Sequence, residues 1–146
     1  MQVFNCMRDT MLREQRDKAL FQAYQIALQE NDFSNQREAV DFVRKNSAPR
    51  WFVSKEFCAA VISSWLRGKD FCKMRINKRR KFIALFDLYK KLKSELPYSA
   101  FTHLDLCAVI VEMPAPEWFI DRQLASRIIT EQMAKRNELM ASRYGR

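Results

Sequence analysis

The chain contains only two glycines in 146 residues, and this scarcity limits the folds that are open to it. β-Hairpins and the tight connections of α/β folds depend on glycine, because glycine adopts backbone angles that other residues avoid. Helices joined by short polar turns need few glycines. The sequence therefore predicts an all-α protein, and the same scarcity excludes the glycine-rich loops that cradle phosphates in nucleotide-binding folds.

Two segments of the chain repeat one another at an offset of 67 residues. Residues 48–53 read Ala-Pro-Arg-Trp-Phe-Val, and residues 115–120 read Ala-Pro-Glu-Trp-Phe-Ile. Further upstream, 19–24 resembles 84–89 at an offset of 65, so the second copy has two additional residues around 97–101. Insertions of this kind are typical of surface loops. We therefore predict an internal duplication, with one copy at 1–70 and the other at 71–146.

Apolar residues at helical spacing predict three helices in each copy. The first helices span about 8–29 and 78–95, and the second copy ends in a helix that frays into a basic tail towards Arg146. Phe57, Val61 and Trp65 form the expected apolar stripe of one third helix. Residues suited to capping precede the predicted helices: Asn77 before the second long helix, Asn35 with Glu38 and Thr102 with Asp105 at the short helices, and Ser54 and Asp121 at the third helices.

The Ala-Pro-x-Trp-Phe segment separates the second and third helices of each copy. Proline cannot continue the preceding helix and favours an extended conformation in the alanine before it. We expect at least one aromatic residue of each pair to pack in the core, and the alternative is a stacking platform for a base or a proline-rich peptide. Gly68 is expected to end the third helix of the first copy in the left-handed conformation.

A long helix, a short helix and a capped third helix resemble the tri-helical helix-turn-helix domain. The resemblance is clearest at 38–66 and 105–133, and it implies that residues near the start of each third helix read DNA bases. The connection at 47–53 is longer than the usual turn and contains no glycine, so the docking geometry departs from that pattern. The Ala-Pro-x-aromatic-aromatic segment also resembles one in small proteins of Bacteroides-type bacteria and their phages or mobile elements, which implies a setting and no mechanism.

Basic residues outnumber acidic residues, and the excess lies mainly in the second half of the chain. Residues 1–70 carry a net charge of +2, and residues 71–146 carry +7. This balance favours an anionic partner such as DNA or RNA, and the alternative is a basic surface that only aids solubility. Eight basic residues between the copies are interrupted by one acid and are expected to contact phosphates: Arg67, Lys69, Lys73, Arg75, Lys78, Arg79, Arg80 and Lys81.

The first turns of the third helices supply the remaining candidates for nucleic-acid binding. Arginine and glutamine side chains make bidentate contacts with guanine and adenine, respectively. An ordinary polar helix face is the alternative explanation of the same residues. The candidates are Arg50 and Lys55 in the first copy, and Arg122, Gln123, Ser126 and Arg127 in the second.

His103 is the single histidine of the sequence, four residues before Cys107. Two ligands do not make a structural zinc site, and no Cys-x-x-Cys pair completes one. A cysteine nucleophile with His103 as its base has no third residue in support. The sequence therefore predicts an exposed histidine and a non-enzymatic protein without a metal, cofactor or catalytic site.

No apolar run has the length of a signal peptide or a membrane span, which predicts a cytoplasmic protein with reduced thiols. We expect a DNA-binding regulator or accessory factor of a phage or mobile element, with double-stranded DNA as its partner and no membrane. The alternative is a structural or adaptor component that binds another protein or a second copy of itself. An exposed apolar patch around Trp51 or Trp118 would indicate that alternative.

Overall fold

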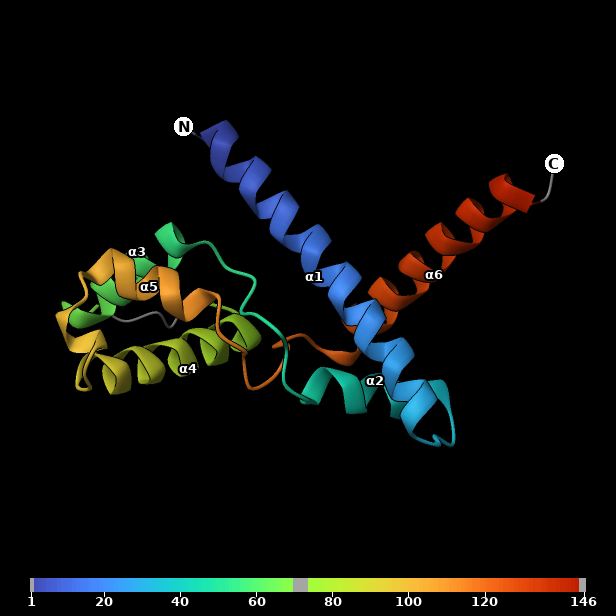
Figure 1. Cartoon of the computed structure of the whole chain (residues 1–146), viewed down its shortest axis with the longest axis horizontal. Coiled ribbons are helices and arrows are strands. Elements are labelled where there is room, and N and C mark those ends of the chain that lie inside the picture. The colour runs from blue at the N-terminus through green and yellow to red at the C-terminus, as the bar shows by residue number, and fades with distance from the viewer. Residues whose placement is uncertain (1, 70–73, 145–146) are drawn as a thin grey trace. The chain divides into compact units, whose positions relative to one another are not determined.

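The structure is a computed structural model that describes the backbone of residues 2–69 and 74–144. It consists of helices, so the prediction of an all-α fold is confirmed (Figure 1). No helix in the described part of the chain has both the length and the apolar character needed to cross a membrane. The elements are α1 (Gln2–Glu30), α2 (Gln36–Lys45), α3 (Lys55–Leu66), α4 (Ile76–Lys93), the 3₁₀ turn η1 (Tyr98–Ala100), α5 (His103–Val111) and α6 (Arg122–Tyr144).

The chain forms two compact units, and each unit takes helices from both sequence copies. Unit 1 comprises Met1–Leu12 and Pro49–Ala115, and therefore contains α3, α4 and α5. Unit 2 comprises Arg13–Ala48 and Pro116–Arg146, and therefore contains most of α1 together with α2 and α6. The predicted copies, 1–70 and 71–146, remain a prediction about the origin of the sequence. In space, each pair of first and second helices is completed by the third helix of the other copy.

This exchange changes the helix-turn-helix arrangement expected from the sequence. The consecutive helices α2 and α3 belong to different units, and so do α5 and α6. The extended Ala-Pro-x-Trp-Phe connections do not turn back on the helix that they follow. In neither unit does a third helix pack on the two helices that immediately precede it in the chain.

Unit 1 is built around the helix pair α3 and α5, against which α4 packs. Its fully buried side chains come from all three helices. Figure 1 shows these three helices next to one another. Lys93 Nζ donates a hydrogen bond of 2.6 Å to Phe101 O and so holds the end of α4 to the loop before α5. The largest fully buried residues of this unit are Ile62, Phe82, Leu85, Leu106 and Ile110.

Unit 2 is built from α1, α2 and the first half of α6, with α2 packed against α6. Buried residues from α1 (Leu20, Tyr24), α2 (Val40) and α6 (Ile128, Ile129) form its core. All residues of α6 from position 134 to 143 are exposed, so the second half of this helix adds nothing to the core. The predicted basic tail is helical as far as Tyr144, and 145–146 lie outside the described residues.

The two Ala-Pro-x-Trp-Phe segments form equivalent corners, one in each unit. Trp51 N–H donates to Val111 O at 3.5 Å in unit 1, and Trp118 N–H donates to Arg44 O at 3.2 Å in unit 2. Both tryptophans are buried, which confirms the core-packing expectation. The next residue has a positive φ in each case, +54° at Phe52 and +56° at Phe119. This backbone conformation is rare outside glycine, so its presence at both corners marks a shared geometry.

Burial follows the same pattern in both sequence copies. Each buried residue of the first copy has a buried counterpart at the offset of 65 or 67, within the part of the chain for which side chains are described. This agreement supports the predicted duplication, which remains an inference from pattern. The pairs are Leu20/Leu85, Tyr24/Tyr89, Ala27/Leu92, Ala39/Leu106, Val40/Cys107, Val43/Ile110, Ala48/Ala115, Trp51/Trp118, Cys58/Ala125, Val61/Ile128 and Ile62/Ile129.

Most of the predicted caps are present in the structure. The side chains of Asn35, Ser54, Thr102 and Asp121 each accept a hydrogen bond from the backbone N–H three residues later, at 2.7–3.2 Å. Gly68 has φ +82° and its N–H donates to Trp65 O, as expected of a left-handed C-cap.

Two sequence predictions about these helices were wrong. Asn77 does not cap α4, which begins one residue earlier, at Ile76; instead, Asn77 Oδ1 accepts a hydrogen bond from Arg80. Phe57 is 42% exposed, because the core face of α3 is turned towards Cys58 and Ile62.

Candidate nucleic-acid interface

The N-terminal end of α4 carries the densest group of basic side chains in unit 1. Arg75 is the N-cap residue, and Lys78, Arg79, Arg80 and Lys81 occupy the first two turns. The core face of this helix begins at Phe82, so the side chains before it remain at the surface. We call these five residues the α4 basic cluster.

The α4 basic cluster is placed where a helix least favours positive charge. The exposed N–H groups of a first turn carry a partial positive charge, which acidic residues or cap side chains usually offset. The first turn of α4 contains no acidic residue, and Arg75 makes no side-chain hydrogen bond to the helix. By contrast, α2, α3 and α5 each have both an acidic residue in the first turn and a side-chain cap. The start of α4 is therefore suited to an anion.

The members of the cluster differ in how far they are engaged within the protein. Lys78 Nζ lies 4.9 Å from the centre of the Phe57 ring, and Arg80 Nη1 lies 3.5 Å from Asn77 Oδ1. Lys81 is half-buried. Arg75 and Arg79 are exposed and have no ion-pair or hydrogen-bond partner for their side chains among the described residues. These two guanidinium groups are the most available for phosphate.

Other basic residues predicted in unit 1 have different surroundings. Lys55 and Lys69 are exposed, at the start of α3 and just after it. Arg67 donates from Nη2 to Ser63 Oγ at 2.9 Å, within its own helix end. Arg50 Nη2 forms an ion pair of 2.7 Å with Glu112, which holds the tryptophan corner to the end of α5. Lys73 lies outside the described residues.

The four predicted base-contacting residues of α6 do not form one outward face. Arg122 Nη1 pairs with Asp41 Oδ2 of α2 at 3.2 Å, and Asp41 also binds Arg44 at 2.7 Å. The hydrogen bond from Arg44 holds the pKa of Asp41 below its ordinary value, with Arg122 adding to the effect. Arg127 lines a pocket beside α1. Gln123 is exposed and Ser126 is half-buried, so the structure does not bring the four together at one surface.

His103 is not the exposed histidine that the sequence predicted. Its ring is half-buried, with Nε2 at 2.8 Å from Ala59 O and Nδ1 at 2.9 Å from the Tyr89 hydroxyl. Because a carbonyl only accepts, Nε2 donates to Ala59, and a neutral ring then accepts from Tyr89 at Nδ1. His103 therefore connects α5 to α3 and α4 in the core of unit 1.

The two cysteines in described positions are buried in unit 1. Cys58 on α3 and Cys107 on α5 are both free and have no exposed surface. A hydrogen bond with Cys107, together with burial, raises the pKa of the Cys58 thiol. Burial disfavours the thiolate of Cys58, and both cysteines serve as small core residues. Burial also raises the pKa of the neighbouring Tyr89.

Two basic features of the structure were missed from sequence. Lys90, Lys91 and Lys93 give α4 a second basic group at its C-terminal end, where positive charge complements the helix dipole. Their spacing in the sequence would have been enough to find them. Arg13 and Arg16 were missed because only the fold brings them close to Arg127.

Within the described residues, no three histidine, cysteine, aspartate or glutamate side chains gather in a way that would hold a metal ion. In comparisons with known proteins, no family model, no curated protein and no solved structure matches this chain.

Proposed function

We propose that this protein binds nucleic acid, in the first place double-stranded DNA, through the α4 basic cluster of unit 1. The observation that carries the proposal is the start of α4, where five basic residues surround helix N–H groups that no side chain caps. Unit 1 has 14 basic and 7 acidic residues, a net charge of +7. A surface of this kind neutralises phosphates and releases their counterions, which is the main source of sequence-independent affinity.

Fewer exposed side chains are placed to contact bases than to contact phosphates. Lys55 is exposed at the start of α3, beside Glu56, and Gln123 is exposed at the start of α6. Arg122 already binds Asp41, and its transfer to a base would break that pair. We therefore propose binding dominated by the phosphate backbone, with a weak sequence preference. A role as accessory factor of a phage or mobile element fits this mode better than a role as a site-specific regulator.

Salt dependence provides the test. A fluorescein-labelled duplex of about 20 base pairs is titrated with the protein at several salt concentrations, and binding is followed by fluorescence polarisation. The triple variant Lys69→Gln, Arg75→Gln, Arg79→Gln removes three exposed basic side chains for which the structure shows no partner. If each contacts one phosphate, the slope of log K against log salt becomes shallower by roughly 2.7, about 0.9 per contact.

The matched control removes the same charge from unit 2. Lys18, Lys45 and Lys135 are exposed there, and their side chains form no ion pair or hydrogen bond with the described residues, although the charge of Lys45 helps to lower the pKa of Asp41. The variant Lys18→Gln, Lys45→Gln, Lys135→Gln is expected to keep the wild-type slope to within about one phosphate contact. If the slope became shallower by the same amount in both variants, net charge alone would determine binding, and the proposed interface would be contradicted.

The adaptor function is the second candidate, because the end of α6 presents apolar residues to solvent. Leu139 and Met140 are 60% and 51% exposed, in the half of α6 where every residue from 134 to 143 is exposed. Trp51 and Trp118 contribute nothing to an exposed apolar patch, since both side chains are buried. No duplex binding at low salt, together with self-association measured by light scattering, would favour this function over nucleic-acid binding.

A further inference from the structure

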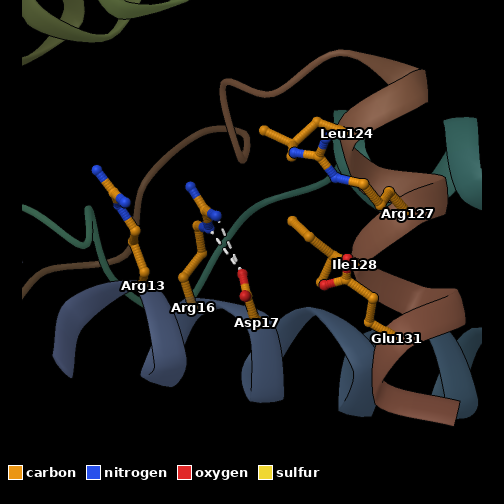
Figure 2. Close-up of a pocket in the computed structure, with 7 residues that line it drawn as sticks. All are labelled: Arg13, Arg16, Asp17, Leu124, Arg127, Ile128 and Glu131. Carbon is orange, nitrogen blue, oxygen red and sulfur yellow. Dashed lines mark hydrogen bonds and ion pairs between the residues drawn. The ribbon is translucent and has the colours of Figure 1, made fainter. Parts of the chain in front are cut away.

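Unit 2 contains a pocket between α1 and α6 that the nucleic-acid proposal does not use. Its volume is about 440 Å³, within the range of sites for small molecules. Three arginines line it, Arg13 and Arg16 from α1 and Arg127 from α6, and Figure 2 shows them around one opening. Leu124 and Ile128 add apolar surface, and two carboxylates, Asp17 and Glu131, complete the lining.

The pocket exists because two counterpart residues differ between the units. In unit 1, Phe57 and Phe82 fill the corresponding space with an edge-to-face contact of 5.5 Å between ring centres. Their counterparts in unit 2 are Leu124 and Asp17, which are smaller and leave the space open. The counterpart of Arg127 in unit 1 is Ala60, so this one charge is specific to unit 2, whereas Arg13 and Arg16 correspond to Lys78 and Lys81. The changes replace packing by a cavity with charged walls.

The arginines of the pocket are not neutralised to the same degree. Arg16 binds Asp17 through Nε and Nη2 at 3.1 and 3.0 Å, as the dashed lines of Figure 2 show. Arg13 and Arg127 are exposed, and their guanidinium groups form no ion pair or hydrogen bond with any described residue. Two guanidinium groups are thus free to bind, one on each wall. Guanidinium forms paired hydrogen bonds with phosphate or carboxylate oxygens and favours the planar, bidentate arrangement.

We propose that this pocket binds a phosphoryl group carried by a molecule of about mononucleotide size. Arg13 and Arg127 bind the phosphoryl oxygens from the two walls. Leu124 and Ile128 contact the apolar part of the ligand, and the carboxylates of Asp17 and Glu131 accept hydrogen bonds from its hydroxyl or amino groups. The phosphoryl group comes either from a free phosphomonoester or from a nucleic-acid backbone.

Calorimetry with adenosine 5′-monophosphate as the probe tests the site. Binding of the probe is expected, and adenosine, which lacks the phosphate, should bind at least about 10-fold more weakly, since it loses the charge-assisted hydrogen bonds to the guanidinium groups. Arg127→Gln should lower the affinity for the probe about 10-fold or more, and Arg13→Gln should have the same effect. Lys135→Gln removes an exposed charge of α6 outside the pocket and should leave affinity unchanged.

The outcomes separate this proposal from the α4 proposal. Equal binding of the probe and adenosine, or an unchanged affinity in Arg127→Gln, would overturn the phosphoryl site, as would no binding of the probe. Duplex DNA that displaces the probe identifies the backbone as the source of the phosphoryl group, and failure to displace it identifies a free phosphomonoester. The variant Lys69→Gln, Arg75→Gln, Arg79→Gln keeps the pocket intact and should bind the probe as the wild type does.

Discussion

Units 1 and 2 share one plan but fill the space between their long helix and their third helix differently. Unit 1 places Phe57 against Phe82 there, and unit 2 leaves a pocket lined by Asp17 and Leu124. Residues such as Trp51 and Trp118, which set the corners, are the same in both. The comparison shows that the tryptophan corner goes with the three-helix arrangement in both units. The space between the long helix and the third helix can be filled or left open without a change in that arrangement.

Charge separates the units further. Unit 1 has 14 basic and 7 acidic residues, whereas unit 2 has 12 and 10. The uncapped, basic start of α4 belongs to the first, and the arginine pocket belongs to the second. A basic surface suits a long polyanion, and a small pocket suits one phosphoryl group. The difference predicts two anion-binding functions in one chain.

One ion pair of unit 1 corresponds to two positions of opposite charge in unit 2. Arg50 pairs with Glu112 in unit 1. The positions that correspond to them in unit 2 hold Glu117 and Lys45, with the two charges exchanged. An exchange of this kind keeps an opposite-charge pair at equivalent places, which is what two copies under the same electrostatic constraint would retain.

The largest expected effect comes from truncating either tryptophan corner. Trp51→Ala and Trp118→Ala should each cost about 3–5 kcal/mol, because each removes a buried indole. If the units unfold separately, Trp51→Ala will speed alkylation of the buried thiols Cys58 and Cys107, and Trp118→Ala will not. Mass spectrometry of the peptides that contain these two cysteines measures the rates. Equal acceleration in both variants would show that the units unfold together.

Substitution of His103 should have an effect of intermediate size that is specific to unit 1. Its counterpart in the first copy is Gln36, so unit 2 has no equivalent link. His103→Ala should lower the free energy of unfolding by about 1–3 kcal/mol, because the Ala59 carbonyl and the Tyr89 hydroxyl lose their partner. Chemical denaturation of this variant and of Tyr89→Phe measures the effect. Tyr89→Phe should cost less, and an equal or greater loss would argue against the central role of the histidine.

The smallest expected effect belongs to the Asp41 pairs, which only unit 2 contains. The counterparts of Asp41 and Arg122 in unit 1 are Ala108 and Lys55. Asp41→Asn should cost roughly 0.2–1 kcal/mol at neutral pH, as expected of a partly exposed ion pair. Because the pKa of Asp41 is lowered in the folded state, this contribution is present above about pH 4 and disappears as the pH falls through the folded pKa. Denaturation series at pH 7 and pH 3 should show a smaller variant effect at pH 3 than at pH 7, and an effect of the same size at both would refute the electrostatic origin.

Local structure was largely predictable from sequence, because caps and helical periodicity act within a few residues. Ser54 and Asp121 were identified as caps for this reason. The packing of α3 on α4 and α5 of the other copy was not predictable. The repeat predicts three helices in each copy, but it does not tell which third helix packs on which pair of first and second helices. The arginine pocket was missed for the same reason, because Arg13 and Arg127 are 114 positions apart in the sequence.

The exchange of third helices also has a consequence for synthesis on the ribosome. The helices α1 and α2 are made before α3, α4 and α5, but α6, which covers their apolar faces, is made after them. Long sequence separation between contacting helices slows folding and leaves apolar surface exposed in the nascent chain. A polypeptide cut near residue 70 would yield two fragments, neither of which holds all the helices of one unit, and only their reassociation would restore both cores.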